Sequence, residues 1–241
     1  MRLALLLTVI VFLVTLLVRL PARAALVILP ARVACETPAG TVWNGSCEEL
    51  RVGGARIAGL SWTLHPWPLL RLHLAADVAA HDPAASGQGR LDLAPHGALS
   101  IQALGALVAL PGGFGPLPGG ASGVLQLAID SARLESGHVV ALQGHIELQQ
   151  LRLADPPAEL GSFELQFPPP TPGAPLLGQL RDLSGPLSVV GVVTLGRDGG
   201  YDLEGSIAAK SDPDGELANL LQLLGPPDAQ GRHVFSIAGT L

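Results

Sequence analysis

The chain has 241 residues, enough for an N-terminal targeting or membrane element followed by one domain of roughly 200 residues. It is 48% hydrophobic and 14% charged, and its 30 glycines and 21 prolines favour short strands and turns over long solvated helices. A formal net charge of -6, without a run of lysines or arginines, leaves nothing to neutralise a phosphate backbone, so we expect no nucleic-acid binding.

The first predicted element is a membrane segment. The run from Leu3 to Val18 has no charge, and Arg19 and Arg23 follow it. It is slightly shorter than the ~18–20 apolar residues that span a bilayer core, although the apolar residues after Arg19 extend the membrane contact. We expect residues 1–23 to form an uncleaved anchor and residues 24–241 to form one exported β-rich domain.

A cleaved signal peptide is the alternative for this segment. Ala22-Arg23-Ala24 offers small residues at the two positions that a signal peptidase reads. The arginines after the apolar run argue against an N-terminus on the cytoplasmic side. Long domains are translocated largely regardless of flanking charge, so the domain is placed outside the cytoplasm.

Two cysteines, Cys35 and Cys47, flank a segment that is rich in turn residues. If Gly40 to Gly45 turns the chain back on itself, the two sulfurs meet and close a loop worth roughly 3 kcal/mol. A disulfide suits an oxidising periplasm. Two unpaired thiols that pack as small apolar residues are the alternative. No histidine pair or CxxC accompanies them, so a metal site is not expected.

Behind the cysteines, apolar and polar residues alternate with period two, which predicts antiparallel strands with one wet face. Gly53-Gly54 and Asp198-Gly199 are hairpin signals. After a break at His65–Pro68, we expect a strand from Leu70 to Val78. Further strands are expected around residues 50–52, 60–64, 91–93, 99–101, 125–129, 140–148, 163–167, 201–207 and 235–241.

One segment has helical spacing instead. Leu217, Leu220, Leu221 and Leu224 follow Asp212-Pro213 and precede Gly225-Pro226. We predict an amphipathic helix of about three turns that covers one end or face of the sheet. The proline-rich stretches 111–120 and 168–175 are predicted loops, because proline cannot donate to a strand ladder. The fold class is therefore all-β: an N-terminal transmembrane helix, a largely antiparallel curved sheet and one short C-terminal helix.

No motif in the sequence carries recognisable chemistry. The seven histidines are dispersed, and prolines and a turn separate His65, His73 and His81, which recur every eight residues. Trp62 and Trp67 bracket a proline-rich turn and are expected to pack at the core or edge; a platform for a peptide or glycan is the alternative. We predict no catalytic residue, no metal, no cofactor and no small-molecule substrate.

Two groups of residues near the chain ends form a recognisable pattern. The first is Gly40-Thr41-Val42-Trp43-Asn44-Gly45, a GTVWxG block, followed by Trp62, Leu64 and Pro66 and a leucine-rich stretch. The second is Leu224-Gly225-Pro226-Pro227-Asp228 with Gly231-Arg232. In this order they resemble the type II secretion system protein N family, also called general secretion pathway protein N. Between about residues 87 and 180 only the alternating strands and glycines agree, and the cysteines have no place in the family pattern.

The resemblance implies a single-pass inner-membrane subunit in a Gram-negative bacterium, with most of the chain in the periplasm. It would be an accessory part of the machine that exports folded proteins across the outer membrane. The implied contacts are platform proteins L and M, protein C or the secretin. The motif residues are expected to be structural: Gly40, Thr41, Val42, Trp43, Gly45, Trp62, Pro66, Gly225, Asp228, Gly231 and Arg232.

Three other functions stay open at this point. A curved sheet with an apolar groove would suit an AsmA-like module that binds or transfers lipid in the periplasm. A periplasmic enzyme would need a nucleophile with a paired base, which the sequence does not display. An exported structural protein without an anchor would differ in its mature N-terminus.

Overall fold

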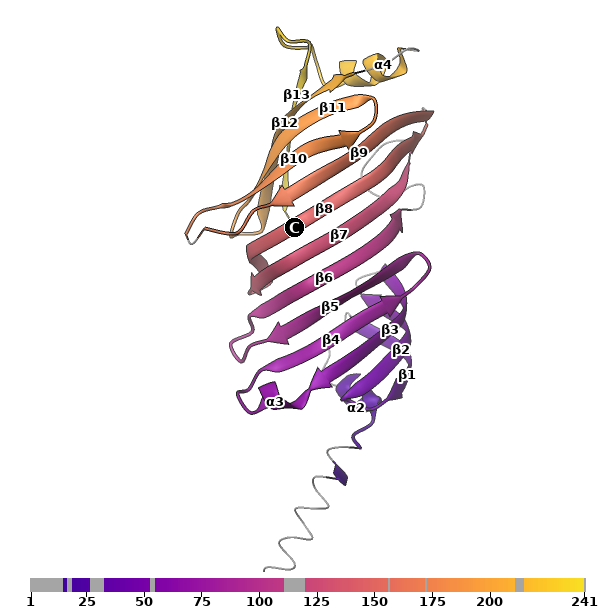
Figure 1. The fold of residues 1–241 in the computed structure, drawn as a ribbon, viewed down its shortest axis with the longest axis vertical. Helices are drawn as coiled ribbons and strands as arrows, with labels where there is room; N and C mark the ends of the chain where they lie inside the picture. The colour runs from indigo at the N-terminus through magenta and orange to yellow at the C-terminus, as the bar shows by residue number, and fades with distance from the viewer. Residues whose placement is uncertain are drawn as a thin grey trace, which may run out of the picture. The chain divides into compact units, whose positions relative to one another are not determined.

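The computed structural model describes residues 15–16, 19–26, 33–52, 55–110, 120–155, 157–171, 173–210 and 215–240. By its contacts, the chain divides into two compact units, Met1–Pro95 and His96–Leu241. The boundary falls just after the fifth strand (Figure 1). The expectation of one domain over residues 24–241 stays a prediction.

The first unit is an antiparallel sheet with two short helices at the same end of its strands. Each strand pairs with the next one along the chain, from β1 to β5 (Figure 1). The elements in order are α2 (Ala22–Leu26), β1 (Val33–Gly40), β2 (Asn44–Val52), β3 (Ala55–His65), α3 (Pro66–Leu69), β4 (Leu74–His81) and β5 (Ala85–Leu93).

The second unit has the same design, and its strands β6 to β8 are longer than any strand of the first unit. Sequence neighbours again pair antiparallel, from β6 to β13. Its elements are β6 (Leu99–Leu110), β7 (Ala121–Glu135), β8 (His138–Ala154), β9 (Pro157–Phe167), β10 (Leu176–Ser184), β11 (Leu187–Leu195), β12 (Gly200–Ala209), α4 (Glu216–Gln222) and β13 (His233–Thr240). The prediction of an all-β, antiparallel protein is confirmed.

Strand register separates an apolar face from a polar face in each unit, because neighbouring side chains point to opposite sides. In the first unit, Trp62 lies opposite Val78 on one face and Asp77 opposite Arg90 on the other. In the second unit, apolar residues form a row across seven strands: Leu127, Ile146, Leu165, Leu180, Gly191, Gly205 and Phe235. A polar row runs across four strands on the other face: Gln126, Glu147, Glu164 and Arg181.

Four aromatic rings lie over glycines on neighbouring strands. A Cβ added to any of these glycines would lie 2.3–2.8 Å from the nearest ring atom, closer than a methyl group tolerates. The pairs are Trp62 on Gly45, Phe167 on Gly178, Phe235 on Gly205 and Tyr201 on Gly239. Glycine at these inward positions leaves room for a ring, and the ring shields the exposed backbone from water. The apolar face is therefore continuous at these glycines, because a ring from the neighbouring strand covers each of them.

The C-terminal helix covers part of the apolar face. Leu217 and Leu221 are buried and pack with Leu187 and Val189 of β11. The predicted helix is confirmed in place but is shorter, because it has seven residues and its N-cap is Gly215 instead of Asp212. Residues 211–214 lie outside the described part. Leu224, predicted on the buried side, follows the helix and is 46% exposed.

Two further sequence expectations need correction. The strand predicted from Leu70 begins at Leu74, because Pro66 starts the short helix α3 and the next residues form hydrogen-bonded turns. Strands β1 and β10 were not predicted, since the proline in β1 and the irregular spacing in β10 weaken the period-two signal. The predicted loop 168–175 is confirmed over its described residues, whereas residues 111–119 lie outside them.

In the part of the chain that the structure describes, no helix has the length and apolar character needed to cross a membrane. Of the predicted anchor, residues 1–23, the structure describes Thr15, Leu16 and residues 19–23; the rest lies outside the described residues.

Candidate functional site

The GTVWxG block forms the turn between β1 and β2. The Thr41 amide donates to the Asn44 carbonyl at 2.8 Å, and the Asn44 amide donates to the Thr41 hydroxyl at 3.1 Å. Gly40 has φ +84°, and a Cβ there would lie 2.4 Å from the Asn44 carbonyl oxygen. Only glycine fits this position, because it lacks a Cβ and adopts positive φ without strain.

Trp62 of β3 closes this turn from the apolar face. It lies opposite Gly45 in the strand register, and its indole Nε1 donates to the Val42 carbonyl at 3.0 Å. A Cβ on Gly45 would lie 2.3 Å from the Trp62 ring. Two motif residues that are seventeen positions apart thus form one packed unit, in which the glycine provides the space and the indole fills it.

The same turn is bonded to two other segments. The Val42 amide donates to the Leu20 carbonyl at 2.9 Å, and Pro21 forms an isolated antiparallel bridge with Thr41. On the other side, the Leu64 amide donates to the Trp43 carbonyl at 2.7 Å. Trp43 is half-buried. The block therefore connects Leu20 and Pro21, which follow the apolar run within the predicted anchor segment, to the end of β3.

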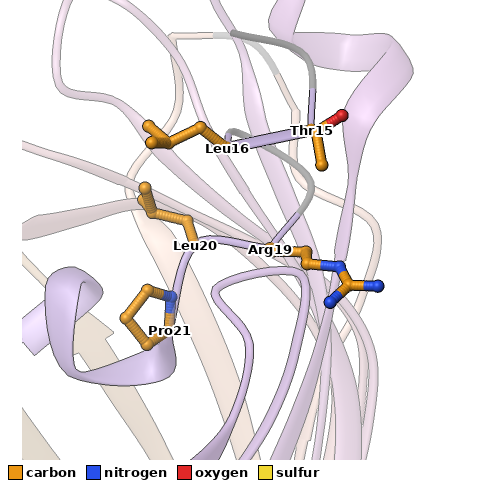
Figure 2. Close-up of a pocket in the computed structure, with 5 residues that line it drawn as sticks. All are labelled: Thr15, Leu16, Arg19, Leu20 and Pro21. Atoms are coloured by element: carbon orange, nitrogen blue, oxygen red, sulfur yellow. The ribbon is translucent and has the colours of Figure 1, made fainter. Parts of the chain in front are cut away.

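A pocket lies in the segment that precedes this turn. Its lining residues are Thr15, Leu16, Arg19, Leu20 and Pro21. Figure 2 shows Leu16, Leu20 and Pro21 on one side, while the Arg19 guanidinium extends to the other. All five residues belong to the predicted anchor segment, where an aliphatic surface is expected, so the pocket is not assigned to a ligand.

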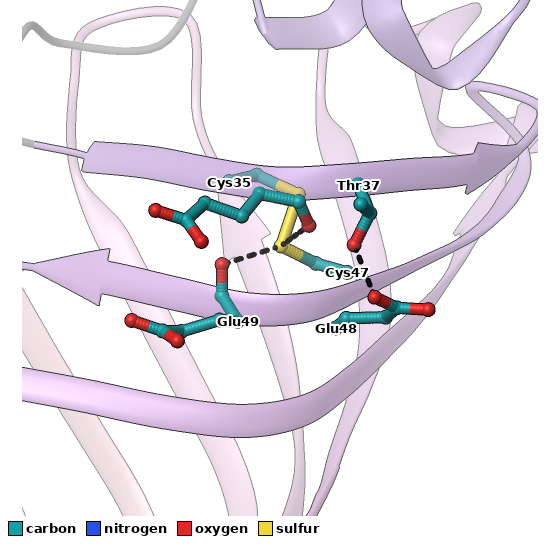
Figure 3. Close-up of a disulfide and its surroundings, with 6 residues drawn as sticks. Cys35, Thr37, Cys47, Glu48 and Glu49 are labelled. Atoms are coloured by element: carbon teal, nitrogen blue, oxygen red, sulfur yellow. Dashed lines mark hydrogen bonds between the residues drawn. A yellow bond between two sulfur atoms is a disulfide. The ribbon is translucent and has the colours of Figure 1, made fainter.

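The structure joins Cys35 and Cys47 in a disulfide between β1 and β2, with a Cα–Cα distance of 5.8 Å (Figure 3). Beside it, Thr37 has φ 50°, and its hydroxyl donates to Glu48 at 2.6 Å. The chain turns back as the sequence reasoning required for this pairing. The disulfide thus closes the same hairpin whose tip is the GTVWxG turn.

Pro66, the last residue of the N-terminal motif, occupies the first position of α3, where its missing N–H is no loss. The residues after it project outward. Trp67 is 79% exposed, so its predicted packing at the core or edge is wrong. Leu70 and Leu72 are also largely exposed. Hydrogen bonds from the amides of residues 70–73 to the carbonyls of residues 67–69 fix this loop.

The polar face of the first unit carries two histidine–aspartate pairs. His65 Nε2 lies 2.7 Å from Asp77, and His73 Nδ1 lies 2.9 Å from Asp92. Arg90 donates to the same Asp77 carboxylate at 2.7 Å. Hydrogen bonds from Arg90 and then His65 lower the pKa of Asp77 to about 2. These pairs sit on an open strand surface, where solvated ion pairs are the ordinary arrangement.

The C-terminal motif forms a second structural corner, in the other unit. The Asp228 carboxylate accepts from the amides of Gln230 and Arg232 at 2.9 and 2.8 Å, which holds the turn that leads into β13. The Gly231 amide donates to the Asp228 carbonyl at 3.0 Å. The Gly225 carbonyl lies 2.7 Å from Nδ1 of the buried His233.

Arg232 connects this turn to two strands. Its guanidinium donates to the hydroxyl and carbonyl of Ser206 on β12 at 2.8 and 3.0 Å. It also donates to the hydroxyl and carbonyl of Ser188 on β11, both at 3.2 Å. One side chain therefore joins three consecutive elements of the sheet, which suits the rigid fork of donors that arginine provides.

The structure thus brings the predicted site residues together in two groups, one per unit. In the described ranges, no group of three or more His, Cys, Asp or Glu side chains is placed to hold a metal ion. The chain is therefore an all-β protein of antiparallel strands with one apolar and one polar face, in which the motif residues stabilise two turns between strands.

Comparison with known proteins gives the family. The model of the family described as type II secretion system (T2SS), protein N matches residues 31–236, and the chain belongs to this family. The chain is similar to the type II secretion system protein N of Vibrio cholerae serotype O1, with 26% identity over 96% of this chain and 95% of that one. The protein of the same name from Aeromonas hydrophila is 28% identical over 94% and 93% of the two chains. No solved structure matches. Membership makes the chain a component of type II secretion.

Sequence reasoning missed three features of these corners. The ring-on-glycine pairing was not predicted, although glycines at inward strand positions were a visible signal. The Arg232 contacts to Ser188 and Ser206 depend on strand order, which periodicity does not give. The ion pairs of Asp77 depend on the register between β4 and β5, which places Arg90 opposite Asp77 and which the sequence pattern does not specify.

Proposed function

We propose that the chain is a non-catalytic accessory subunit of the type II secretion system. It is anchored in the inner membrane by its N-terminal segment and acts in the periplasm by contacting other subunits during export of folded proteins. The observation that carries this proposal is that the family-motif residues have structural roles. Its residues hold turns and strand pairs together and connect Leu20 to the sheet, and none is aimed into a reaction centre.

The disulfide supports the compartment. A bond between Cys35 and Cys47 persists outside the cytoplasm, where thiols are not kept reduced. The apolar run in residues 3–18 would keep the domain near the inner membrane. From there the sheets are available to platform proteins L and M, to protein C or to the secretin.

A cross-linked pull-down from native membranes tests the proposal. The tagged full-length chain is cross-linked in cells, purified in detergent, and the recovered proteins are identified by mass spectrometry. Recovery of secretion subunits above the level obtained with an unrelated single-pass periplasmic protein is the expected result. Their absence from a strain that secretes actively would overturn the proposal.

A periplasmic lipid-binding module of the AsmA-like type is the second candidate. The apolar row across β7 to β13 favours it, because α4 covers only one part of that face. Such a module would carry acyl chains through purification. Lipid extraction and mass spectrometry of the purified protein separate the two candidates, since a protein-contact subunit would release no stoichiometric lipid.

A further inference from the structure

The loop between α3 and β4 carries three large apolar side chains into solvent. Trp67 and Leu70 are each 79% exposed and Leu72 is 76% exposed, with Arg71 exposed between them. Scattered single apolar residues on a surface need no explanation, but a contiguous group marks a contact surface. Here the three exposed side chains lie within six consecutive positions of one loop.

The backbone holds these side chains outward. The amides of Leu70, Arg71 and Leu72 donate to the carbonyls of residues 67–69 at 2.9–3.2 Å, so the loop is a fixed turn. Leu72 has φ 61°, a left-handed conformation that costs free energy for a residue of this kind. Asparagine or glycine would suit that backbone better. An apolar side chain that is both exposed and placed at a strained backbone position points to a use for it.

The position of the loop identifies what it touches. Leu64, just before α3, bonds to Trp43, and Val42 of the same turn bonds to Leu20. Leu20 directly follows the apolar run and Arg19. Figure 1 accordingly shows α2 and α3 at the same end of the first unit's strands. The chain therefore leaves the predicted membrane segment beside the exposed loop.

We infer that the Trp67–Leu72 loop inserts into the lipid surface of the membrane that anchors the chain. Tryptophan and leucine with an adjacent arginine are typical of a polypeptide lying at the boundary between headgroups and acyl chains. This contact would give the first unit a second attachment and fix its orientation relative to the bilayer. The inference rests on the proposed N-terminal anchor.

The test uses the full chain in vesicles of phosphatidylethanolamine and phosphatidylglycerol. Because Cys35 and Cys47 form a disulfide, one added cysteine takes an environment-sensitive fluorophore alone. Arg71→Cys places the probe within the loop and leaves its apolar residues intact. Ala84→Cys is the matched control, exposed in the turn at the other end of β4, which has 8 residues, about 25 Å in length.

Nitroxide-labelled lipid is expected to quench the probe at position 71 several-fold more than the probe at position 84. Replacing the loop's apolar residues in the variant W67S/L70S/L72N should remove that difference while the chain still floats with vesicles. Leu72→Asn alone, which relieves the backbone, serves as a second variant and should reduce the quenching.

Equal quenching at both positions in a chain that floats with the vesicles would overturn the inference and leave the anchor standing. A chain that does not float with the vesicles would overturn the anchor as well. The two failures are therefore distinguishable.

Discussion

Gly45→Ala tests the packing of the motif corner. The new Cβ would lie 2.3 Å from Cζ2 and 2.6 Å from Cε2 of Trp62, and 2.9 Å from the Thr41 carbonyl oxygen. Carbon atoms pack at about 3.5–4.0 Å, so the indole must move by more than about 1 Å. That shift breaks the bond from Trp62 Nε1 to the Val42 carbonyl.

The expected cost follows from these contacts. Overpacking costs about 1–3 kcal/mol and the lost hydrogen bond about 0.5–1.5 kcal/mol. Alanine recovers about 0.5–1 kcal/mol in a strand because it is less flexible than glycine when unfolded. At the midpoints of these ranges, the net loss of unfolding free energy should be about 2 kcal/mol. Urea denaturation followed by tryptophan fluorescence measures it, because all three tryptophans lie in the first unit.

Gly105→Ala is the matched control. Gly105 is in strand β6, and a Cβ there would meet nothing within 4 Å, so alanine should raise the unfolding free energy of the second unit by about 0.5–1 kcal/mol, measured by far-UV circular dichroism. The decisive comparison repeats Gly45→Ala in a Trp62→Ala background, where its cost should fall by about 1 kcal/mol or more. An equal cost in both backgrounds would refute the ring-on-glycine explanation.

Three further predictions concern other parts of the two units. Because the pKa of Asp77 is lowered to about 2 from the ordinary 3.8, its interactions stabilise the first unit above about pH 4, and this contribution is lost as the pH falls through about 2. Asp77→Asn should flatten that part of the stability-against-pH curve, and an unchanged curve would contradict the ion-pair assignment. The variant C35A/C47A should lose about 2–4 kcal/mol in urea denaturation, and dithiothreitol should destabilise the wild-type chain by a similar amount; a wild-type chain whose stability does not change in dithiothreitol would contradict the disulfide. Gly161→Ala should destabilise the second unit by more than about 1 kcal/mol, because its φ is +102° and the Cβ would lie 2.2 Å from the Ser184 carbonyl oxygen. A neutral effect by circular dichroism would rule out that close approach.

The sequence predicted the strands whose alternation is regular. The segment from Val140 to Leu148 and the hairpin around Asp198-Gly199 are where they were expected, because a half-buried antiparallel strand shows its two faces directly in the sequence. The same reasoning wrongly placed Leu70 and Leu72 in a strand. They continue the alternation of β4, but Pro66 and Pro68 start a helical turn that ends it.

The sequence predicted which motif positions form turns, but it did not predict which residues they contact. Glycine at positions 40 and 45 indicated a tight turn, and the structure places that turn where the sequence put it. The partner of Gly45 is Trp62, and only the pairing of β2 with β3 reveals it. Likewise, Arg232 reaches Ser188 and Ser206 through the order of three strands. Contacts of this kind depend on register, which composition and period leave open.

Secretion in the native host is the most direct test of the proposed role. The chromosomal gene is deleted, and a protein known to leave that host by type II secretion is quantified in the periplasm and the medium. The account predicts that the protein accumulates in the periplasm of the deletion strain and that export returns when the wild-type chain is supplied. Unchanged export in the deletion strain would contradict it.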